Sequence, residues 1–381
     1  MMKKAKIILF VVLIVIAAGI IMHSQLFELL FYKYNSLQSN NLLNAPIQVE
    51  QEAHVHFFKS GFAVSGTNTK FYTYDGKEMS LPFTPEDIAL IGNSPVINQS
   101  TSRYALINSK FVYDTTHIPF KPVYAIEEGS EGFDIRELGD VLLIVLKTQN
   151  NLLKPIIMGE GDTYTINMEG TDHSHYLDAS YDPITKDFSI LTLATDTPYP
   201  SSRVFNFTNN NSPQGMLSLN DSMFYKIYRT QKSFVLVGIH QLICYNIDGS
   251  IKWSINAPNC YIHHYVPLGN DMMFYFPKAR FNGANAVYVR SNGEKELLEL
   301  PYGLTDIQPY KNQQLIALDK NANLVVIGKA GNTVKTYTLD VHPIKVYWSS
   351  FAPDDFYVLS RDNMLYIYTL NKADSRKDEK T

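Results

Sequence analysis

Six of the ten histidines fall in three close pairs, and paired imidazoles are the side chains of this sequence best suited to hold a ligand. The pairs are His54 with His56, His173 with His175, and His263 with His264. Side chains alternate between the two faces of a strand, so His54 and His56 share a face whereas His263 and His264 do not. Neutral imidazole binds Zn²⁺ or Cu²⁺, and protonated imidazole binds anions. Histidine is also an ordinary lining residue of polar channels, so both a ligand site and a polar wall remain open.

Two groups of carboxylates offer candidates for hydrolytic chemistry. Asp172, Asp178 and Asp182 form one group, and Glu127, Glu128 and Glu131 form the other. Glycoside hydrolysis needs two carboxyl groups about 5 to 9.5 Å apart, a distance that sequence spacing does not give. Carboxylates in loops are usually only solvated. We therefore assign no catalytic residue, and a hydrolase or lyase acting on cell-surface glycan is the alternative function.

The chain has two cysteines, Cys244 and Cys260, which excludes a four-cysteine metal site. A disulfide between them would close a short loop and stabilise the fold by roughly 3 kcal/mol. Two reduced, buried thiols are the other interpretation, because the sequence does not place the sulfurs within bonding distance.

The composition is that of a folded, β-rich protein. The 381 residues are 45% hydrophobic and 18% charged, and the 25 Tyr and 21 Phe favour pleated sheet over helix. The formal net charge is −4, with Lys and Arg dispersed along the chain. This distribution provides no basic face for a phosphate backbone, so we expect no nucleic-acid partner.

The N-terminus has the pattern of a membrane anchor. Residues 7–22 are an unbroken apolar run that follows Lys3, Lys4 and Lys6. As a helix this run is ~24 Å long, and Leu26 and Phe27 extend it towards the ~30 Å of a bilayer core. The small residues that a signal peptidase requires lie inside the run, which disfavours cleavage. We therefore predict a single transmembrane signal anchor over residues 7–27.

The lysine bias predicts the orientation of this anchor. Positive charge stays cytoplasmic, and only Lys33 follows the apolar run closely. Residues 1–6 are then cytoplasmic, and the rest of the chain lies outside the membrane. We expect residues 28–46 to be a juxtamembrane stalk and linker, residues 47–370 to be the folded domain, and residues 371–381 to be a disordered charged tail.

A short apolar strand recurs along the whole folded domain. Its copies are separated by 37 to 47 residues, on average 42, and begin at Phe62, Tyr104, Val141, Phe188, Phe234, Met272, Leu315 and Phe356. A four-stranded propeller blade has this length. The sequence predicts an all-β fold, a β-propeller of eight blades, or of seven if the units at Tyr104 and Val141 merge around residues 127–139.

Four glycine-containing turns support this interpretation. Asp75-Gly76, Asp248-Gly249, Asn292-Gly293 and Gly331-Asn332 occupy the same place in their units and suit the positive φ of hairpin turns. The innermost strand of each blade should precede each recurring strand, over segments that include 53–60, 174–182, 261–268 and 343–351. These segments would place the histidine pairs in or beside the wall of a central channel.

The last repeat lacks an outer strand of its own, because charged residues follow Leu370. Residues 45–51 alternate Ile47 and Val49 with polar residues and have no other role. We predict that they complete the last blade as an N-terminal strand and so cover an exposed sheet edge.

Residues 243–255, ICYNIDGSIKWSI, carry an aromatic strand, an Asp-Gly turn and a strand with Trp253. This pattern resembles the PQQ-like repeat of quinoprotein-type propellers, a family of dehydrogenases and of a non-catalytic outer-membrane assembly factor. Residues 71–83 and 334–339 match it in part. The layout also resembles single-pass, membrane-anchored propeller proteins of Gram-positive bacteria. The resemblance implies the fold rather than an activity.

We expect no cofactor, because the adjacent cysteines of many quinone-dependent dehydrogenases have no counterpart here. The predicted function is that of a membrane-tethered, extracytoplasmic, non-catalytic module for protein interaction or ligand sensing. Its expected partner is another membrane or cell-surface protein.

Overall fold

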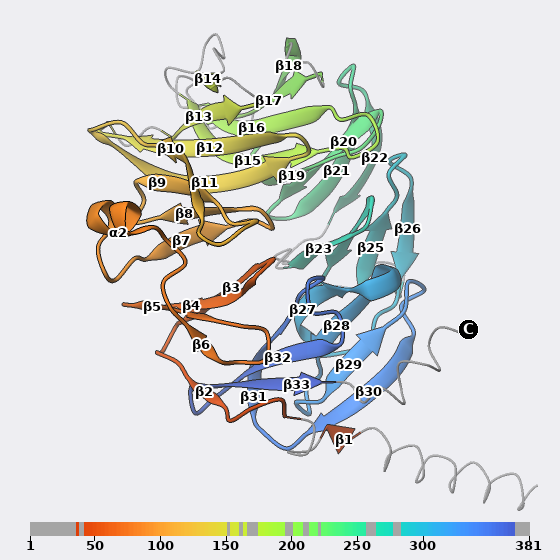
Figure 1. The fold of residues 1–381 in the computed structure, drawn as a ribbon. Coiled ribbons are helices and arrows are strands. Elements are labelled where there is room, and N and C mark those ends of the chain that lie inside the picture. The colour runs from red at the N-terminus through yellow and green to blue at the C-terminus, as the bar shows by residue number, and fades with distance from the viewer. Residues whose placement is uncertain are drawn as a thin grey trace, which may run out of the picture.

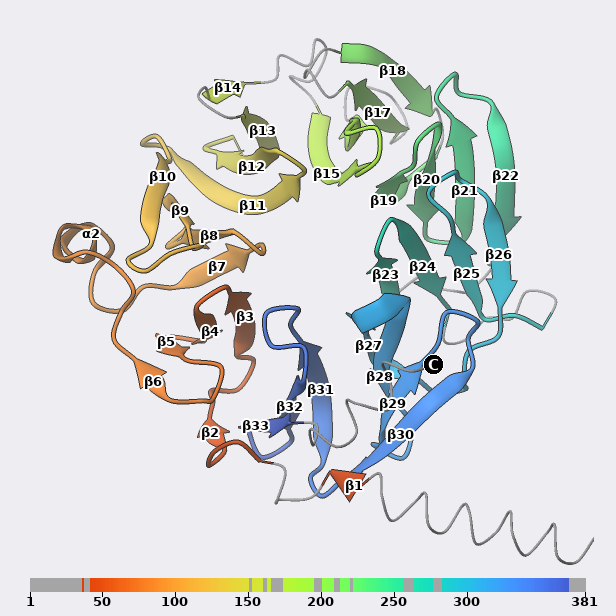
Figure 2. The ribbon, with the colours of Figure 1, turned by 45° about the vertical axis from the view of Figure 1, so that its right-hand side comes forward.

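One unit of antiparallel strands repeats eight times around a central axis (Figures 1 and 2). The computed structural model describes residues 36–37, 42–150, 153–159, 163–165, 174–194, 201–208, 213–219, 222–256, 264–276 and 283–369. The predicted anchor over residues 7–27 and the predicted tail over residues 371–381 lie outside these ranges. Within them, no helix has the length and apolar character needed to cross a membrane.

The first four blades each contain four consecutive strands. Their bounds are β3 His54–Phe58, β4 Gly61–Ser65, β5 Thr69–Tyr72 and β6 Glu78–Met79 in blade 1; β7 Ile97–Ser100, β8 Tyr104–Ile107, β9 Phe111–Asp114 and β10 Lys121–Ala125 in blade 2; β11 Ser130–Leu138, β12 Val141–Thr148, β13 Leu153–Met158 and β14 Thr163–Thr165 in blade 3; β15 Ser174–Tyr181, β16 Phe188–Ala194, β17 Ser201–Phe207 and β18 Pro213–Leu219 in blade 4. A short helix, α2 (Pro85–Ile91), connects blades 1 and 2.

The remaining blades follow the same order. Their bounds are β19 Phe224–Arg229, β20 Ser233–Gly238, β21 Gln241–Asn246 and β22 Ile251–Asn256 in blade 5; β23 His264–Leu268, β24 Asp271–Tyr275, β25 Ala286–Val289 and β26 Lys295–Leu298 in blade 6; β27 Thr305–Tyr310, β28 Gln314–Leu318, β29 Leu324–Ile327 and β30 Thr333–Leu339 in blade 7; β31 Pro343–Trp348, β32 Asp355–Ser360 and β33 Met364–Thr369 in blade 8. A short 3-10 helix, η2 (Lys311–Gln313), separates β27 from β28.

The recurring apolar strand of the sequence is the second strand of each blade. All eight observed second strands begin within one residue of the predicted position, which confirms the repeat. These strands could be recognised because they are buried on both faces, as β4 and β20 are along their whole length. The units at Tyr104 and Val141 form separate sheets, so the seven-blade alternative is wrong.

The N-terminal segment closes the ring as predicted. Strand β2 (Ile47–Gln48) pairs antiparallel with β33, with Ile47 opposite Leu365. Further backbone hydrogen bonds run from Leu43 N–H to the Ile367 carbonyl, 3.0 Å, and from Val49 N–H to the Asn363 carbonyl, 2.9 Å. The outer strand of blade 8 therefore comes from the opposite end of the described chain.

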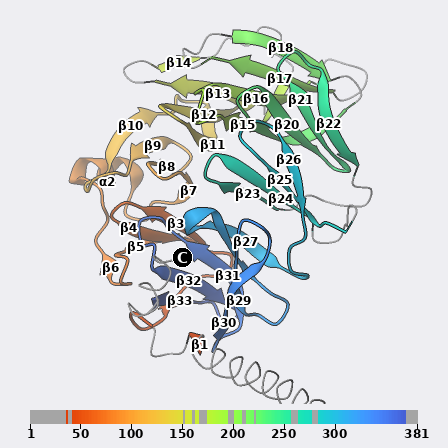
Figure 3. The same cartoon turned by 90° about the vertical axis from the view of Figure 1, so that its right-hand side faces the viewer.

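A second N-terminal strand pairs with the neighbouring blade. Strand β1 (Ser36–Leu37) pairs parallel with β30 through Thr338 and Leu339, so that blade 7 has a fifth strand. In all three views β1 lies beside β30 at the outer side of the ring (Figures 1, 2 and 3). The structure thus places Ser36–Leu37 against blade 7 and Leu42 and Leu43 against blade 8, within the segment that the sequence predicts to be stalk and linker.

The four predicted hairpin turns share one geometry. In each, the glycine N–H donates to the carbonyl of the residue three positions earlier, as Gly249 does to Asn246 at 2.9 Å. The glycines at 76, 249, 293 and 331 have φ values of +85°, +86°, +78° and +85°. Such values are unfavourable for residues with a Cβ atom, which explains the recurrence of glycine at this place.

The apolar core is divided among the interfaces between neighbouring blades. Between blades 1 and 2, the ring of Phe120 packs edge-on against Phe58, Phe71 and Phe83 at centroid distances of 5.4, 6.1 and 5.5 Å. Trp253, the tryptophan of the resemblance, lies on the outer strand of blade 5. Its indole N–H donates to the Gly293 carbonyl of blade 6 at 3.0 Å. Each blade is thus stabilised mainly through its neighbours.

Candidate functional site

The first strand of every blade faces the central axis, as Figure 2 shows. The inner segments predicted from the sequence are the observed strands β3, β15, β23 and β31. In six of the eight inner strands the register shifts against the second strand. These β-bulges lie in the first half of their strands and change the direction of side chains there. The channel wall therefore departs from simple alternation at the end where the inner strands begin.

Inner strands are sheet edges, so one row of their N–H groups has no partner strand. In two places a side chain of the preceding blade accepts these N–H groups. In blade 4, Asp178 Oδ2 accepts from Ile227 N–H at 3.0 Å and Ser180 Oγ accepts from Arg229 N–H at 2.8 Å. In blade 7, Asp306 accepts from Val346 N–H. These inner-strand carboxylates connect neighbouring blades.

The strongest concentration of charge on the channel wall spans blades 3, 4 and 5. Asp178 Oδ1 lies 3.2 Å from Arg136 Nη1 and 3.2 Å from Lys226 Nζ, and Arg136 Nε lies 2.9 Å from Asp134. Burial raises the pKa of Asp178, and the two neighbouring cations act in the opposite direction. Two carboxylates thus face two cationic side chains, and the formal charges of the cluster sum to zero.

The structure does not gather the carboxylates that the sequence grouped together. Asp178 pairs with cations of other blades. Asp182 accepts hydrogen bonds from Thr185 N–H and Oγ1–H, at 2.9 and 2.7 Å, within the turn that follows β15. Asp172 lies outside the described residues. Glu127 and Glu128 precede β11, and Glu131 is its second residue. Asp178 and Asp182 are thus bound to different partners, Asp178 to other blades and Asp182 to its own turn.

Of the three histidine pairs, only His54 and His56 are both described, and they lie on β3, the inner strand of blade 1. The rings of His54 and His56 lie on one face of β3 with centroids 6.5 Å apart, and His56 Nδ1 lies 2.8 Å from Ser100 Oγ of blade 2. Burial, with a smaller contribution from His54, lowers the pKa of His56 to about 4, so this ring is neutral at pH 7. Within the described ranges, no three or more His, Cys, Asp or Glu side chains are arranged to hold a metal ion.

The other histidine pairs are described only in part. His175 lies on β15 and is partly buried, and His264 is the first residue of β23. His173 and His263 lie outside the described residues, so the ligand site of three histidine pairs stays a prediction.

Cys244 is buried on β21, and burial raises the pKa of its thiol. Cys260 lies outside the described residues, so the disulfide and the two reduced thiols both stay predictions.

Five exposed apolar side chains lie near the starts of inner strands, in five of the eight blades. We call this set the apolar rim: Phe133, Met223, Tyr265, Tyr302 and Ile344. Phe133, Tyr265 and Ile344 lie in the first half of β11, β23 and β31, while Met223 and Tyr302 precede β19 and β27. Every inner strand runs in the same direction along the central axis. The five residues, each in the first half of a different inner strand or just before it, are therefore on the same face of the ring. Sequence reasoning missed the rim, because bulges re-aim Phe133 and Ile344.

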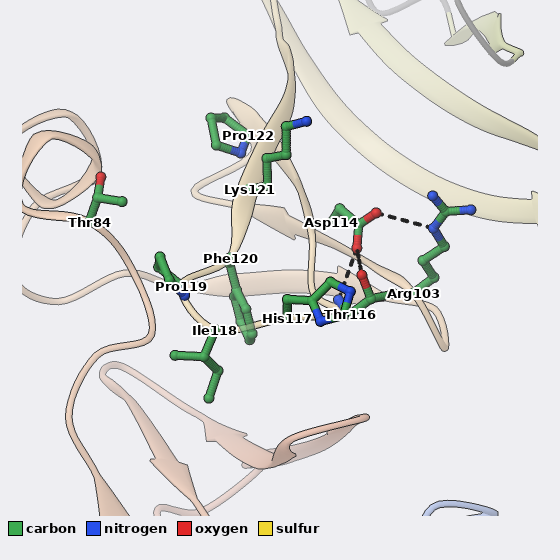
Figure 4. A pocket seen from close by; sticks show the side chains of 10 residues that line it. All are labelled: Thr84, Arg103, Asp114, Thr116, His117, Ile118, Pro119, Phe120, Lys121 and Pro122. Atoms are coloured by element: carbon green, nitrogen blue, oxygen red, sulfur yellow. Dashed lines mark hydrogen bonds and ion pairs between the residues drawn. The ribbon is translucent and has the colours of Figure 1, made fainter.

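A hollow of about 620 Å³ lies at the turn between β9 and β10, opposite Thr84 at the start of α2 (Figure 4). Asp114 is at its edge and accepts hydrogen bonds from Arg103 Nε at 3.1 Å and from Thr116 N–H and Oγ1–H at 2.9 and 2.6 Å. Burial would raise the pKa of Asp114, but these hydrogen bonds outweigh it and the pKa is lowered. The sequence had no motif that marked this hollow.

The comparisons with known proteins identify the fold. Neither any protein-family model nor any curated protein matches the sequence. Sqt1 of Saccharomyces cerevisiae is similar in structure, with a TM-score of 0.51 and 10% identity over 89% of this chain and 99% of that one. BamB of Moraxella catarrhalis has a TM-score of 0.48 and 12% identity over 86% of this chain and 99% of that one. The WD40 domain of Pan2 of Neurospora crassa has a TM-score of 0.44 and 10% identity over 84% and 89%. At 10% identity, the match to Sqt1 supports the fold and nothing finer.

Proposed function

We propose that this protein is a non-catalytic interaction module, tethered to the outer side of a membrane, that holds a partner protein against the apolar rim of its propeller. The apolar rim is the observation that carries the proposal. Tyr302 is 70% exposed and Phe133 is 51% exposed, and Met223 joins them on the same face. Aromatic residues and methionine are enriched in protein interfaces, where a few of them supply most of the binding energy.

The channel wall gives independent support to an interaction role. A hydrolase needs a carboxylate that can take or give a proton to a substrate. Asp178 and Asp306 instead accept N–H groups of neighbouring inner strands, and Asp178 also pairs with Arg136 and Lys226. Their positions are explained by inter-blade bonding. Within the rim, Tyr265 contacts Lys226, whose Nζ lies 5.2 Å from its ring centroid, whereas Tyr302 and Phe133 are 70% and 51% exposed.

Photo-crosslinking from the rim is expected to capture a partner protein. A photoreactive residue in place of Tyr302 should form an adduct in intact cells, and one in place of Phe133 should capture the same protein. Met223→Asp should reduce the Tyr302 adduct at least tenfold, because a carboxylate that a partner buries in an apolar interface is left unpaired. Mass spectrometry of the adducts identifies the partner and shows whether both positions reach it.

Ile251 is the matched control for this experiment, since it is 60% exposed but lies on the outer strand β22 of blade 5. Equal adducts from Ile251 and Tyr302, or none from the rim, would contradict an interface at the rim. Circular dichroism of Met223→Asp checks that the propeller stays folded.

The proposed tether rests on the apolar run at residues 7–27 and on the pairing of β1. Eight residues, 28–35, separate the proposed anchor from Ser36, and they span at most about 28 Å. Because β1 pairs with β30, blade 7 would be held near the membrane. Blades 3 and 4 lie across the ring from blades 7 and 8 and would face away from it (Figures 1 and 2).

External protease is expected to digest the propeller in intact cells or spheroplasts, while the protein stays in the membrane pellet at high salt. The lysines before the apolar run predict this orientation. Immunoblotting of the pellet, with a cytoplasmic protein as the control for lysis, measures the loss. A protected propeller, or release of the chain into the medium, would refute the tether without affecting the rim.

A further inference from the structure

The hollow at the β9–β10 turn of blade 2 combines an apolar lining with a basic edge (Figure 4). Ile118 and Pro119 form part of the apolar lining, and the buried ring of Phe120 lies beside them. The volume of about 620 Å³ is within the range of small-molecule sites. Ile118 is 49% exposed, and its neighbours His117 and Pro119 are exposed as well, while Thr115 and Phe120 on either side of this segment are buried.

The turn that carries this lining is fixed at both ends. Thr115 is buried, and its N–H and Oγ1–H both donate to the Arg103 carbonyl, at 2.8 and 3.0 Å. Phe120 N–H donates to the Pro82 carbonyl at 2.7 Å. These bonds preorganise the hollow, so a ligand would not have to order the turn.

The charges at the edge favour an anion. Asp114 is the one acid among the lining residues, and both of its oxygens already accept hydrogen bonds from Arg103 and Thr116. The Arg103 guanidinium stacks over the Tyr104 ring at 5.1 Å and uses only its Nε towards Asp114. Its side chain is still half exposed, and Lys121 also lines the hollow. The lining carries one more formal positive charge than negative charge.

We propose that this hollow binds a small amphipathic carboxylate, with its apolar body against Ile118 and Pro119 and its anionic head against Arg103 and Lys121. An arginine presents planar, paired donors that match a carboxylate, and the lysine adds a point charge. The site lies on blade 2, at the turn between its third and fourth strands, and does not include the apolar rim.

Three probes with one apolar body and different heads test the proposal: 3-phenylpropionate, 3-phenylpropanol and 3-phenylpropylamine. The full chain in lipid nanodiscs is titrated with each and followed by saturation-transfer NMR, with empty nanodiscs subtracted. The carboxylate is expected to bind with a dissociation constant on the order of 1 mM, and the other two at least fivefold more weakly. Equal binding of all three probes, or no binding of the carboxylate, overturns the proposal.

Variants locate the binding. Arg103→Gln is expected to weaken binding of 3-phenylpropionate about tenfold. Lys121→Gln is expected to weaken it about two- to fivefold, because the ion pair between Lys121 and the ligand is exposed to solvent. Ile118→Ser should weaken all three probes alike. Lys121 and Ile118 are exposed, so these two variants report on binding even if Arg103→Gln disturbs the turn. Lys252→Gln and Ile251→Ser on β22 are the matched controls, and an equal loss from them would place the binding elsewhere.

Discussion

Deletion of residues 45–51 is expected to unfold the whole propeller in a single cooperative transition at a much lower temperature than the parent chain. The deletion removes β2, the buried Val49 and the hydrogen bonds to β33. It also removes Glu50, whose carboxylate accepts Thr67 N–H and Oγ1–H at 2.6 and 2.7 Å. The loss of two apolar side chains alone costs about 3 kcal/mol or more. Differential scanning calorimetry measures the shift.

The matched control is deletion of residues 372–381, which the sequence predicts to be a solvated tail. We expect that variant to unfold within about 1 °C of the parent. A small shift for the 45–51 deletion, or a transition in which one blade melts separately, would contradict closure of the ring by the N-terminal segment. The experiment separates a ring that depends on its closing strand from an array of independent blades.

Replacement of Asp187 by alanine is expected to destabilise the protein by about 3–5 kcal/mol, because it leaves a buried charge without its partner. Arg229 is 1% exposed, and its Nη2 lies 3.2 Å from Asp187 Oδ2 across the boundary between blades 4 and 5. Among the described residues, Arg229 Nε and Nη1 have no hydrogen-bond partner. Burial lowers the pKa of Arg229, and the charge of Asp187 opposes this effect. Urea denaturation measures the free energy of unfolding.

Two controls interpret this result. Glu296→Ala removes the partner of Arg290 in an exposed ion pair and should cost less than about 1 kcal/mol. The double variant Arg229→Met with Asp187→Leu removes both charges and should recover most of the loss, since no unpaired ion remains buried. A cost for Asp187→Ala as small as that for Glu296→Ala would show that Arg229 does not depend on this carboxylate.

Much of the fold could be predicted because the most informative strands are also the most buried. Second strands such as Ser233–Gly238 are covered on both faces by neighbouring blades, so they appear in the sequence as continuous apolar runs. The positive φ at Gly249 and Gly293 requires glycine, which marks the turns. The closing strand followed from counting, since the repeat that ends in β33 has three strands of its own.

Neither strand β1 nor the wall of the channel could be predicted in the same way. Strand β1, at the outer side of the ring, pairs through only two residues and does not differ in sequence from the segment around it. The bulges in β11 and β31 change which side chains face the channel, and no residue type requires them. For this reason the sequence identified histidines as the channel residues of interest but did not identify Phe133 or Ile344.

Asp178 is a residue whose partners could not be predicted from its neighbours in the chain. The repeat, its glycine turns and the missing outer strand could be predicted from the sequence, because burial and backbone conformation restrict which residues can occupy each position along the chain. The sequence pattern grouped Asp178 with Asp172 and Asp182, its neighbours in the chain. The bonds of Asp178 to Arg136, Lys226 and the N–H of Ile227 form only in the folded ring. Those partners belong to the blades on either side, and their approach depends on how whole sheets pack around the axis, which no local pattern encodes.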